Sequence, residues 1–366
     1  MDEIIDFSNC KRIYRNYGGS DRKFSVEYND EVYLLKFSGD HAKRHDISTS
    51  AVNNVVSEYI SSHISASMGL PTHQTYLGVY HDEIVVGCKD FRKSGEQNME
   101  FSELIKSVYD SRDITRHVLL QQIYETLCNP INALPQSLIT ASIERFWDTF
   151  VVDALVGNFD RHTGNWGFLI ANDKIHRLAP VYDYGSTLFP NLSDEGADAL
   201  ITDDFEMLKR CIVFPSPVLC VTREKVGKVG YYDMLSSNYD KNCTLALLRM
   251  ASMISLDAIN KIIDETPLIT ETRKIFYKSI IALRKKVIID RAYEKCLDED
   301  YDKESVNHIY LGIQRTDKDI NALLNDFHIS EYLQTLNRTA KYNADAQSQY
   351  KRAKRGKGIK TDFDDI

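Results

Sequence analysis

Short runs rich in apolar residues, separated by turn signals, recur in the first 92 residues and predict a β-rich N-terminal part, with clear period-two alternation over 31–37. The runs that we expect to be strands lie at 10–15, 24–28, 31–37, 75–79 and 83–86. Apolar residues at helical spacing predict one helix within this part, over 48–68, with Ser48, Thr49 or Ser50 as its N-cap. Gly69 and Pro71 are typical of its end.

From residue 102 onward the spacing of apolar residues is mainly helical. The helices that we expect lie at 119–127, 143–156, 242–254, 256–264, 271–296 and 317–336. A strand, turn and return strand over 166–181 interrupt them, and the acidic segment 194–204 is expected to be a mobile loop. A β-rich part followed by a helical part indicates an α+β fold.

Composition is ordinary for a globular protein, with 366 residues, of which 43% are hydrophobic and 27% charged. The seven cysteines are odd in number and form no C-x-x-C pair, which favours reduced thiols in a cytoplasm over disulfides or zinc. No stretch approaches the ~20 apolar residues of a membrane helix, so we expect no membrane partner.

The formal net charge of −8 argues against a general nucleic-acid binder. Basic residues are nevertheless concentrated at 351–360, within a charged tail over 341–366 that we expect to be flexible. This basic run is the one segment that could dock nucleic acid or an acidic partner.

The stretch from Gly157 to Gly185 carries the residue types that phosphoryl transfer from a nucleotide requires. Asp160 and Asn165 are five positions apart, as in the protein-kinase catalytic loop H-R-D-x-x-x-x-N, and Asp183 opens an Asp-Tyr-Gly triplet like Asp-Phe-Gly. One carboxylate can take the proton of an acceptor hydroxyl, while an amide oxygen and a second carboxylate can hold magnesium. Here Arg and His follow the first Asp instead of preceding it, so the pattern is kinase-like without being that of an ordinary protein kinase.

Polar loop residues are also common as caps and turns, and a lone D-x-x-x-x-N would be explained in that way. The context favours a site, because a predicted helix ends at Gly157 and a predicted hairpin separates Asn165 from Asp183. Such an order can bring the polar side chains together at one end of the hairpin.

The N-terminal part supplies the other residues that bind a nucleotide in a kinase, in the expected order. Gly18, Gly19, Ser20 and Lys23 lie in a turn that could cradle phosphates, although a plain hairpin turn fits as well. Lys36 shares a strand face with Val32 and Leu34, which suits a lysine aimed at a ligand or one with a solvated tip. Glu58 flanks the apolar stripe of the helix, within reach of that lysine. The strand end formed by Lys89, Asp90 and Phe91 is expected to hold adenine through backbone groups.

These motifs resemble the HipA-like serine/threonine kinases, and most closely their short CtkA-like branch. The matching segments are 17–23, 34–37, 57–59, 69–71, 157–162 with Asn165, and 178–186. The resemblance implies a two-lobed, protein-kinase-like fold, which we divide into an N-lobe over 1–92 and a helical C-lobe over 93–340.

By that resemblance, Asp160 is the catalytic base, Lys36 pairs with the phosphates of ATP, and Asn165 and Asp183 bind Mg²⁺. His162, within the matched Asp-Arg-His, completes the catalytic set that we predict. The resemblance also implies a protein hydroxyl as acceptor, a translation-related substrate, and a small antitoxin as partner. Because relatives can phosphorylate a serine in their Gly-rich loop, Ser20 is the candidate for autophosphorylation, with a plain turn residue as the alternative.

Two other functions stay open from the sequence. The G-x-x-D-R-H-x-x-N arrangement is also similar to that of phosphoinositide lipid kinases, so a lipid or small-molecule hydroxyl is a second possible acceptor. The acidic segment 194–204 argues against a membrane-facing site. A non-catalytic binding protein on a kinase scaffold is a third possibility, which the presence of Lys36, Asp160, Asn165 and Asp183 disfavours.

Overall fold

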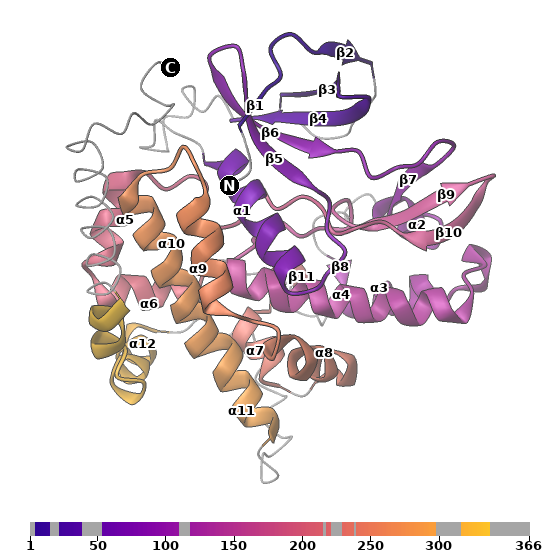
Figure 1. Ribbon diagram of the computed structural model, residues 1–366. Helices are drawn as coiled ribbons and strands as arrows, with labels where there is room; N and C mark the ends of the chain where they lie inside the picture. Colours follow the sequence, from indigo (N-terminus) through magenta and orange to yellow (C-terminus); the bar gives the residue numbers. More distant parts are fainter. Residues whose placement is uncertain are drawn as a thin grey trace.

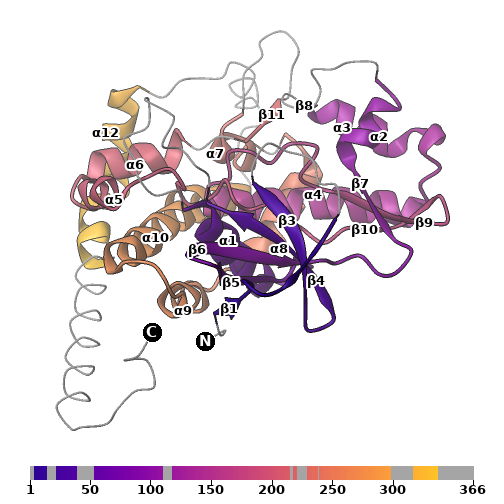
Figure 2. The same ribbon diagram turned by 90° about the horizontal axis from the view of Figure 1, so that it is seen from above.

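The computed structural model describes residues 4–14, 22–38, 53–109, 118–214, 217–220, 229–237, 239–297 and 316–336. The fold is α+β with two lobes: strands gather in the upper, N-terminal lobe of Figure 1, and helices make up most of the lower lobe. Seen from above in Figure 2, the helices extend beyond the sheet on several sides. This arrangement confirms the fold class that the sequence predicts.

A six-stranded sheet forms the upper lobe, in the order β1-β5-β6-β4-β3-β2. Its strands are β1 (Ile5–Asp6), β2 (Lys11–Ile13), β3 (Lys23–Tyr28), β4 (Glu31–Phe37), β5 (Thr75–Tyr80) and β6 (Glu83–Lys89). On β4 the side chains of Tyr33, Leu35 and Phe37 are buried and pack with Phe7 and Tyr80 on one face. Lys36 therefore points to the opposite face, as period-two alternation predicts.

Helix α1 (Asn54–Ser67) lies under the sheet and is buried along most of its length. Ten of its 14 residues are buried, because it packs against β5 and β6 on one side and against α9 (Leu256–Glu265) on another. The helix begins at Asn54, so the predicted start near residue 48 was wrong, and Ser48, Thr49 and Ser50 lie outside the described residues. Its end before Gly69, which has φ of +82°, confirms the predicted stop.

The lower lobe is built around α4 (Gln136–Val156) and α10 (Glu271–Arg284), which contact each other in one hydrophobic core. The surrounding helices are α2 (Phe101–Lys106), α3 (Leu120–Cys128), α5 (Asp194–Ile201), α6 (Asp204–Ile212), α7 (Tyr231–Leu235), α8 (Lys241–Ala251), α11 (Arg291–Leu297) and α12 (Asp317–Asp326). A π-helical stretch, Lys285–Asp290, joins α10 to α11.

Two small sheets complete the lower lobe. β9 (Gly167–Ala171) and β10 (Lys174–Leu178) form the predicted hairpin, and β7 (Gln97–Glu100) adds a third strand to it. β8 (Val118–Leu119) pairs with β11 (Leu219–Cys220) in parallel. The catalytic-loop segment comes just before β9 and the segment that leads to Asp183 comes just after β10, so both lie at the open end of the hairpin.

The acidic segment 194–204 is not the loop that the sequence suggested. It forms α5 and the start of α6, and Ser193 and Asp203 cap these helices by accepting hydrogen bonds from the backbone N–H groups of Gly196 and Glu206. Asp194 and Glu195 lie in the first turn of α5, where their negative charges interact favourably with the positive end of the helix dipole. The acidic residues thus stabilise helix starts.

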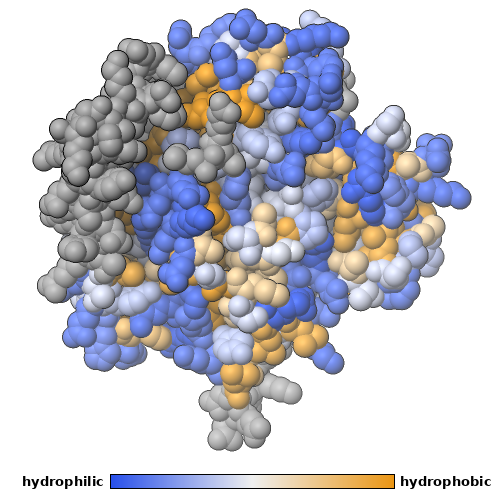
Figure 3. Space-filling view, viewed as in Figure 1, coloured by the Kyte–Doolittle hydropathy of each residue, from blue (hydrophilic) through white to orange (hydrophobic). Residues whose placement is uncertain are grey.

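Hydrophilic residues cover most of the face in Figure 3, and hydrophobic ones lie on it in separate patches. Within the described residues, no single helix combines the length and apolar character needed to cross a membrane. By length and composition, α8 and α9 could do so only together, as a pair bent by 71°.

Candidate active site

Lys36 is the residue that joins the two lobes in this site. Its Nζ lies 2.8 Å from Glu58 Oε2 on α1 and 2.8 Å from Asp183 Oδ1 in the lower lobe. Burial alone would lower the pKa of Lys36, but the adjacent carboxylates of Asp183 and Glu58 raise it well above its ordinary value. The side chain is therefore a fixed cation on the face of β4 that the sequence pattern predicted.

Glu58 holds this lysine from a fully buried position. Its second oxygen, Oε1, accepts a hydrogen bond from the backbone N–H of Tyr184 at 3.1 Å and lies 3.1 Å from His73 Nε2. Burial would raise the pKa of Glu58, whereas Lys36 and His73 hold it far below its ordinary value, so the carboxylate stays charged. A Cβ on Gly185 would lie only 3.3 Å from Glu58 Oε2, so the glycine of the Asp-Tyr-Gly triplet lets the two elements approach closely.

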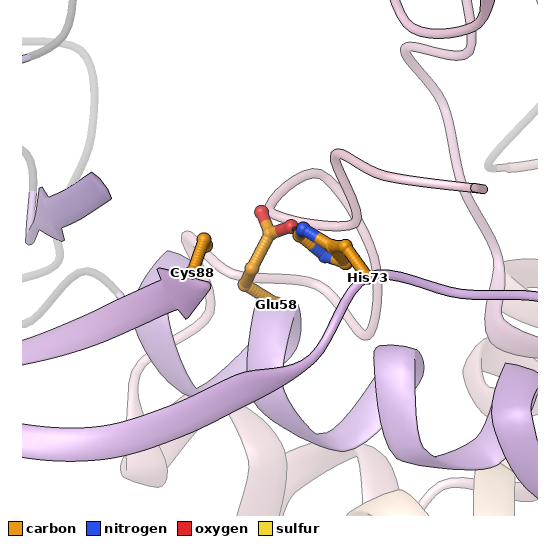
Figure 4. A group of neighbouring side chains, drawn as sticks. All are labelled: Glu58, His73 and Cys88. Carbon is orange, nitrogen blue, oxygen red and sulfur yellow. Dashed lines mark ion pairs between the residues drawn. The ribbon is translucent and has the colours of Figure 1, made fainter. Parts of the chain in front are cut away.

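Glu58, His73 and Cys88 form a buried cluster of possible metal ligands, drawn in Figure 4. Both carboxylate oxygens already have partners, however, and the Lys36 ammonium would repel a cation at this position. Burial also raises the pKa of the Cys88 thiol, which keeps it protonated. We therefore assign the cluster to the support of the Lys36–Glu58 ion pair.

Asp183 adopts a backbone conformation that non-glycine residues rarely have, with φ of +67°. Burial raises the pKa of its carboxyl, but Lys36 outweighs this effect and the pKa lies below the ordinary value. Strained backbone of this kind persists where the surrounding structure enforces it, which is typical of functional positions. Hydrogen bonds from the next residues enforce it here: Tyr184 Oη donates to Ser65 at 2.9 Å, and Thr187 and Ser61 pair at 2.7 Å.

The catalytic-loop segment begins where α4 ends at Gly157, which has φ of +69°. Asn158 then folds the loop back: its Nδ2 donates to Asp153 and its Oδ1 accepts from the backbone N–H of Asp160. Asp160 is exposed at the tip of this turn. An acceptor hydroxyl can therefore reach its carboxylate from solvent.

Asn165 returns to the same turn from the other side. Its Nδ2 donates to the backbone oxygen of Asp160 at 2.8 Å, which directs the amide oxygen away from that contact. His162 is bonded within the loop, where its Nδ1 accepts from Gly164 N–H at 3.0 Å and its backbone oxygen accepts from Asn165. The structure thus brings Asp160, His162 and Asn165 into one compact loop.

Arg161 is a functional candidate that the sequence motifs did not single out. Its guanidinium makes a two-point ion pair with buried Asp153, with Nε–Oδ2 of 2.9 Å and Nη2–Oδ1 of 3.1 Å. It also donates to the backbone oxygens of Asn165 and Tyr182. Because Tyr182 precedes Asp183, one side chain fixes the catalytic loop against the segment that carries the second carboxylate. The signal for it was Asp153 itself, a carboxylate on the apolar face of a predicted helix.

At the strand end predicted to bind adenine, two of the three backbone N–H groups already donate hydrogen bonds within the protein. Lys89 N–H donates to Gln74 and Asp90 N–H donates to Val32, and the Lys89 and Asp90 side chains pair with Glu31 and Arg92. Phe91 stacks on Tyr182 with ring centroids 5.7 Å apart. Within the described part of the chain, Phe91 N–H donates no hydrogen bond, so of the three it is the backbone donor that remains for a base.

Lys23 starts β3 beside Lys36, since the two residues are paired across the strands. Gly18, Gly19 and Ser20, predicted to cradle phosphates, lie outside the described residues, as does the basic run 351–360. The side chains that the structure does bring together are Lys36, Glu58 and Asp183, with the 160–165 loop joined to them through Arg161.

Comparisons with known proteins bear on the family and on the overall fold. The family model of the HipA-like C-terminal domain matches residues 16–209. A serine/threonine-protein kinase, CtkA, of Helicobacter pylori (strain J99) is 35% identical over 297 residues, which is 80% of this chain and 89% of that protein. The crystal structure of the H. pylori proinflammatory kinase CtkA matches with a TM-score of 0.74 and 34% identity, over 81% of this chain and 98% of that one. The Shewanella oneidensis HipA–HipB–operator DNA complex gives a TM-score of 0.47 at 16% identity, over 76% of this chain and 67% of that one.

Proposed function

The chain belongs to the family with a HipA-like C-terminal domain and is a serine/threonine-protein kinase, and from this premise we propose that it is ATP- and Mg²⁺-dependent, with Asp160 as its base. The observation that carries the proposal is the position of Lys36 Nζ, 2.8 Å from both Glu58 and Asp183. Kinases need this lysine–glutamate pair and a metal-binding aspartate in place at the same time. A purely structural site would have no need of three charged groups in contact, one of which, Asp183, has a strained backbone.

The donor set suits magnesium, which prefers hard oxygen ligands. The Asn165 amide oxygen and the Asp183 carboxylate would hold the ion, so both proposed ligands are oxygen atoms. When bound, Mg²⁺ neutralises charge on the phosphates and orients the transferred group. Lys36 would exchange its contact with Asp183 for a phosphate oxygen while Glu58 keeps it in position.

Asp160 carries out the proton transfer in this proposal. Its carboxylate lies exposed at the loop tip, accepts the proton of a serine or threonine hydroxyl, and thereby activates the oxygen that forms the new bond to the γ-phosphorus. The bond to the ADP oxygen breaks in the same displacement. Asn158, Asn165 and Arg161 hold the loop backbone so that Asp160 keeps its direction. His162 supports the same turn through its bond with Gly164.

The remaining binding roles follow the order of the chain. Phe91 N–H would pair with the adenine ring at the end of β6, beside Lys89 and Asp90. Gly18, Gly19, Ser20 and Lys23 would cover the phosphates. A phosphate on Ser20 would add roughly −1.5 to −2 charge where the nucleotide phosphates must bind, so autophosphorylation there would oppose ATP binding.

We also propose the boundaries and partners that the family resemblance suggests. The N-lobe would span 1–92 and the C-lobe 93–340, with a charged tail over 341–366 that could contact an acidic partner or nucleic acid. The substrate would be a protein, with a translation-related protein and a small antitoxin as the first partners to test. The seven cysteines, none of them paired, support a reducing compartment such as the cytoplasm.

The experiment that tests this function is incubation of the purified protein with labelled ATP and magnesium, beside Asp160→Asn. Mass spectrometry then locates each phosphoserine or phosphothreonine. Magnesium-dependent label on the wild type alone supports the proposal. Label that persists in Asp160→Asn, or no label on any protein added, contradicts it.

A further inference from the structure

A partly enclosed cavity of about 40 Å³ lies beside the catalytic loop, and neither Lys36 nor Asp183 lines it. Aromatic and aliphatic side chains make up most of its wall: Phe146 and Phe150 from α4, Trp166, Leu178 and Tyr231. The rings hold one another in place, with centroids 5.7 Å apart for Phe146–Trp166 and 5.0 Å for Phe150–Tyr231. The nucleotide-binding groups described above leave this cavity unused.

The cavity reaches the catalytic loop itself, because His162 and Thr163 line it. Asp160 is three residues from Thr163, so their Cα atoms lie within about 11 Å of each other, and the turn bond from His162 N–H to Asp160 O shortens that path. Successive residues of an extended peptide are about 3.3 Å apart. A peptide with its hydroxyl at Asp160 can thus place a residue two or three positions away at the cavity.

Three features of the cavity indicate what kind of group fits. One water-sized atom needs about 10–15 Å³, so the cavity holds about three such atoms. This is close to the size of a leucine, isoleucine or methionine side chain. Arg145, which also lines it, disfavours a lysine or arginine there, and the carboxylate of Asp153 in the same wall is already paired with Arg161. Thr163 Oγ1 is buried and has no hydrogen-bond partner among the described residues, so the wall keeps one polar group that an incoming peptide could satisfy.

We propose that this cavity binds an aliphatic side chain of the protein substrate, two or three residues from the phosphorylated hydroxyl. The inference rests on the proposed kinase function and adds a substrate class to it. Ala179, Pro180 and Val181 line the cavity just before Tyr182 and Asp183, so an occupant contacts both the catalytic loop and the segment that carries the metal-binding carboxylate. Docking should therefore raise kcat as well as lower KM.

A positional-scanning library of serine and threonine peptides tests this, with one flanking position fixed to each amino acid in turn. For the wild type we expect several-fold more phosphate when Leu, Ile or Met occupies one position within three residues of the acceptor. Leu178 is half-buried in the wall. Leu178→Ala enlarges the cavity and should shift the preferred flanking residue toward Phe. Leu178→Phe fills the cavity and should shift the preferred residue toward Ala. Leu297→Ala, on an exposed residue of α11, is the matched control, and thermal melting confirms that each variant folds.

The possible failures can be told apart. Phosphorylation without an aliphatic preference, or with one that neither Leu178 variant alters, overturns the substrate inference and leaves the kinase function intact. No phosphorylation of any peptide or protein removes the kinase function and this inference with it. N-acetyl-leucine amide provides a further probe, because Trp166 is one of only two tryptophans in the chain and lines the cavity. A saturable change in tryptophan fluorescence on adding this amide, without any peptide preference, would assign the cavity to a free small molecule and overturn the inference.

Discussion

Lys36 and Asp183 are 147 positions apart in the chain, yet the lysine Nζ and the aspartate Oδ1 lie 2.8 Å from each other. The contact crosses from the sheet lobe to the helical lobe, so it exists only when both lobes are assembled. In the proposed function, a nucleotide phosphate would replace Asp183 as the partner of Lys36, and a metal ion would replace Lys36 as the partner of Asp183.

Asp160→Asn should lower the rate of phosphoryl transfer about 10²–10⁴-fold, the range that a general base contributes, because an amide cannot accept the proton of the acceptor. Nucleotide affinity should stay near the wild-type value, since Asp160 is exposed and outside the Lys36 cluster. Steady-state transfer assays and fluorescent-nucleotide titration measure the two quantities. Asp173→Asn, in the turn between β9 and β10, is the control. Equal turnover of Asp160→Asn and wild type would show that another group is the base.

Asp183→Asn should weaken the magnesium dependence of nucleotide binding, because a neutral amide binds the ion more weakly than a carboxylate and no longer attracts Lys36. Asparagine tolerates positive φ, so the backbone at +67° should be kept. Calorimetric titration of ATP with and without magnesium checks the result. Asp30→Asn, at a turn position with φ of +60°, controls for the backbone effect. If the variant bound ATP with unchanged metal dependence, Asp183 would not be a metal ligand.

Glu58→Gln should destabilise the protein near pH 7 by an amount that shrinks in acid. The pKa of Glu58 is lower in the folded state than in the unfolded chain, so its charged form adds stability above its ordinary pKa of 4.5. That stability is lost as pH falls from this value toward the lower, folded-state pKa. Urea unfolding of wild type and variant at pH 7, 5 and 4 measures the difference. The exposed Glu144→Gln should show no such trend, and a difference constant over this range would refute the assignment.

Arg161→Met should cost about 3–5 kcal/mol of unfolding free energy, because it leaves the Asp153 charge buried without its partner. Adding Asp153→Asn should recover part of this loss, since the uncompensated charge is then gone. Chemical denaturation of the four proteins in the cycle gives the coupling. Arg249→Met breaks the more exposed pair with Asp148 and should cost no more than about 1 kcal/mol. Strict additivity in the cycle would mean that Arg161 and Asp153 do not depend on each other.

Transfer assays extend the Arg161 prediction from stability to positioning. In the folded fraction, we expect Arg161→Met to lower kcat more than it raises KM for ATP, because the loop with Asp160 loses its attachment to the segment before Asp183. Arg161→Lys should restore little, since lysine cannot make the two-point contact with Asp153. A full rescue by lysine would indicate that charge alone matters there.

The strands and the site residues were predictable where a periodic pattern along one strand or helix determines which way a side chain points. Period-two alternation placed Lys36 on the correct face of β4, and the spacing of Glu58 along its helix brought it to that lysine. The start of α4 was missed because residues 136–142 are largely polar, although Pro135 before them is a typical start signal. The acidic segment was misjudged because carboxylates that cap helices look, in sequence, like the polar residues of a loop.

Relationships between distant segments were beyond the sequence. Nothing local shows that Arg161 reaches the Tyr182 carbonyl, or that Lys89 and Asp90 use their N–H groups on Gln74 and Val32. Both facts depend on how β4, β5 and the lower lobe are placed in space. The cavity beside the catalytic loop likewise arises from several elements at once and leaves no motif in any one of them.

Helix α1 has a consequence for how such an enzyme can be switched off. Many kinases are controlled by moving the helix that carries the glutamate away from its lysine. In this chain ten of the 14 residues of α1 are buried, and Ser61, Ser65 and Glu58 bind the segment from Tyr184 to Thr187. Rotating α1 outward would separate it from both lobes and break these bonds in one event. Helix α1 therefore keeps Glu58 beside Lys36 in this fold. We expect such an enzyme to be controlled through the access of nucleotide or substrate to the site and not through movement of this helix.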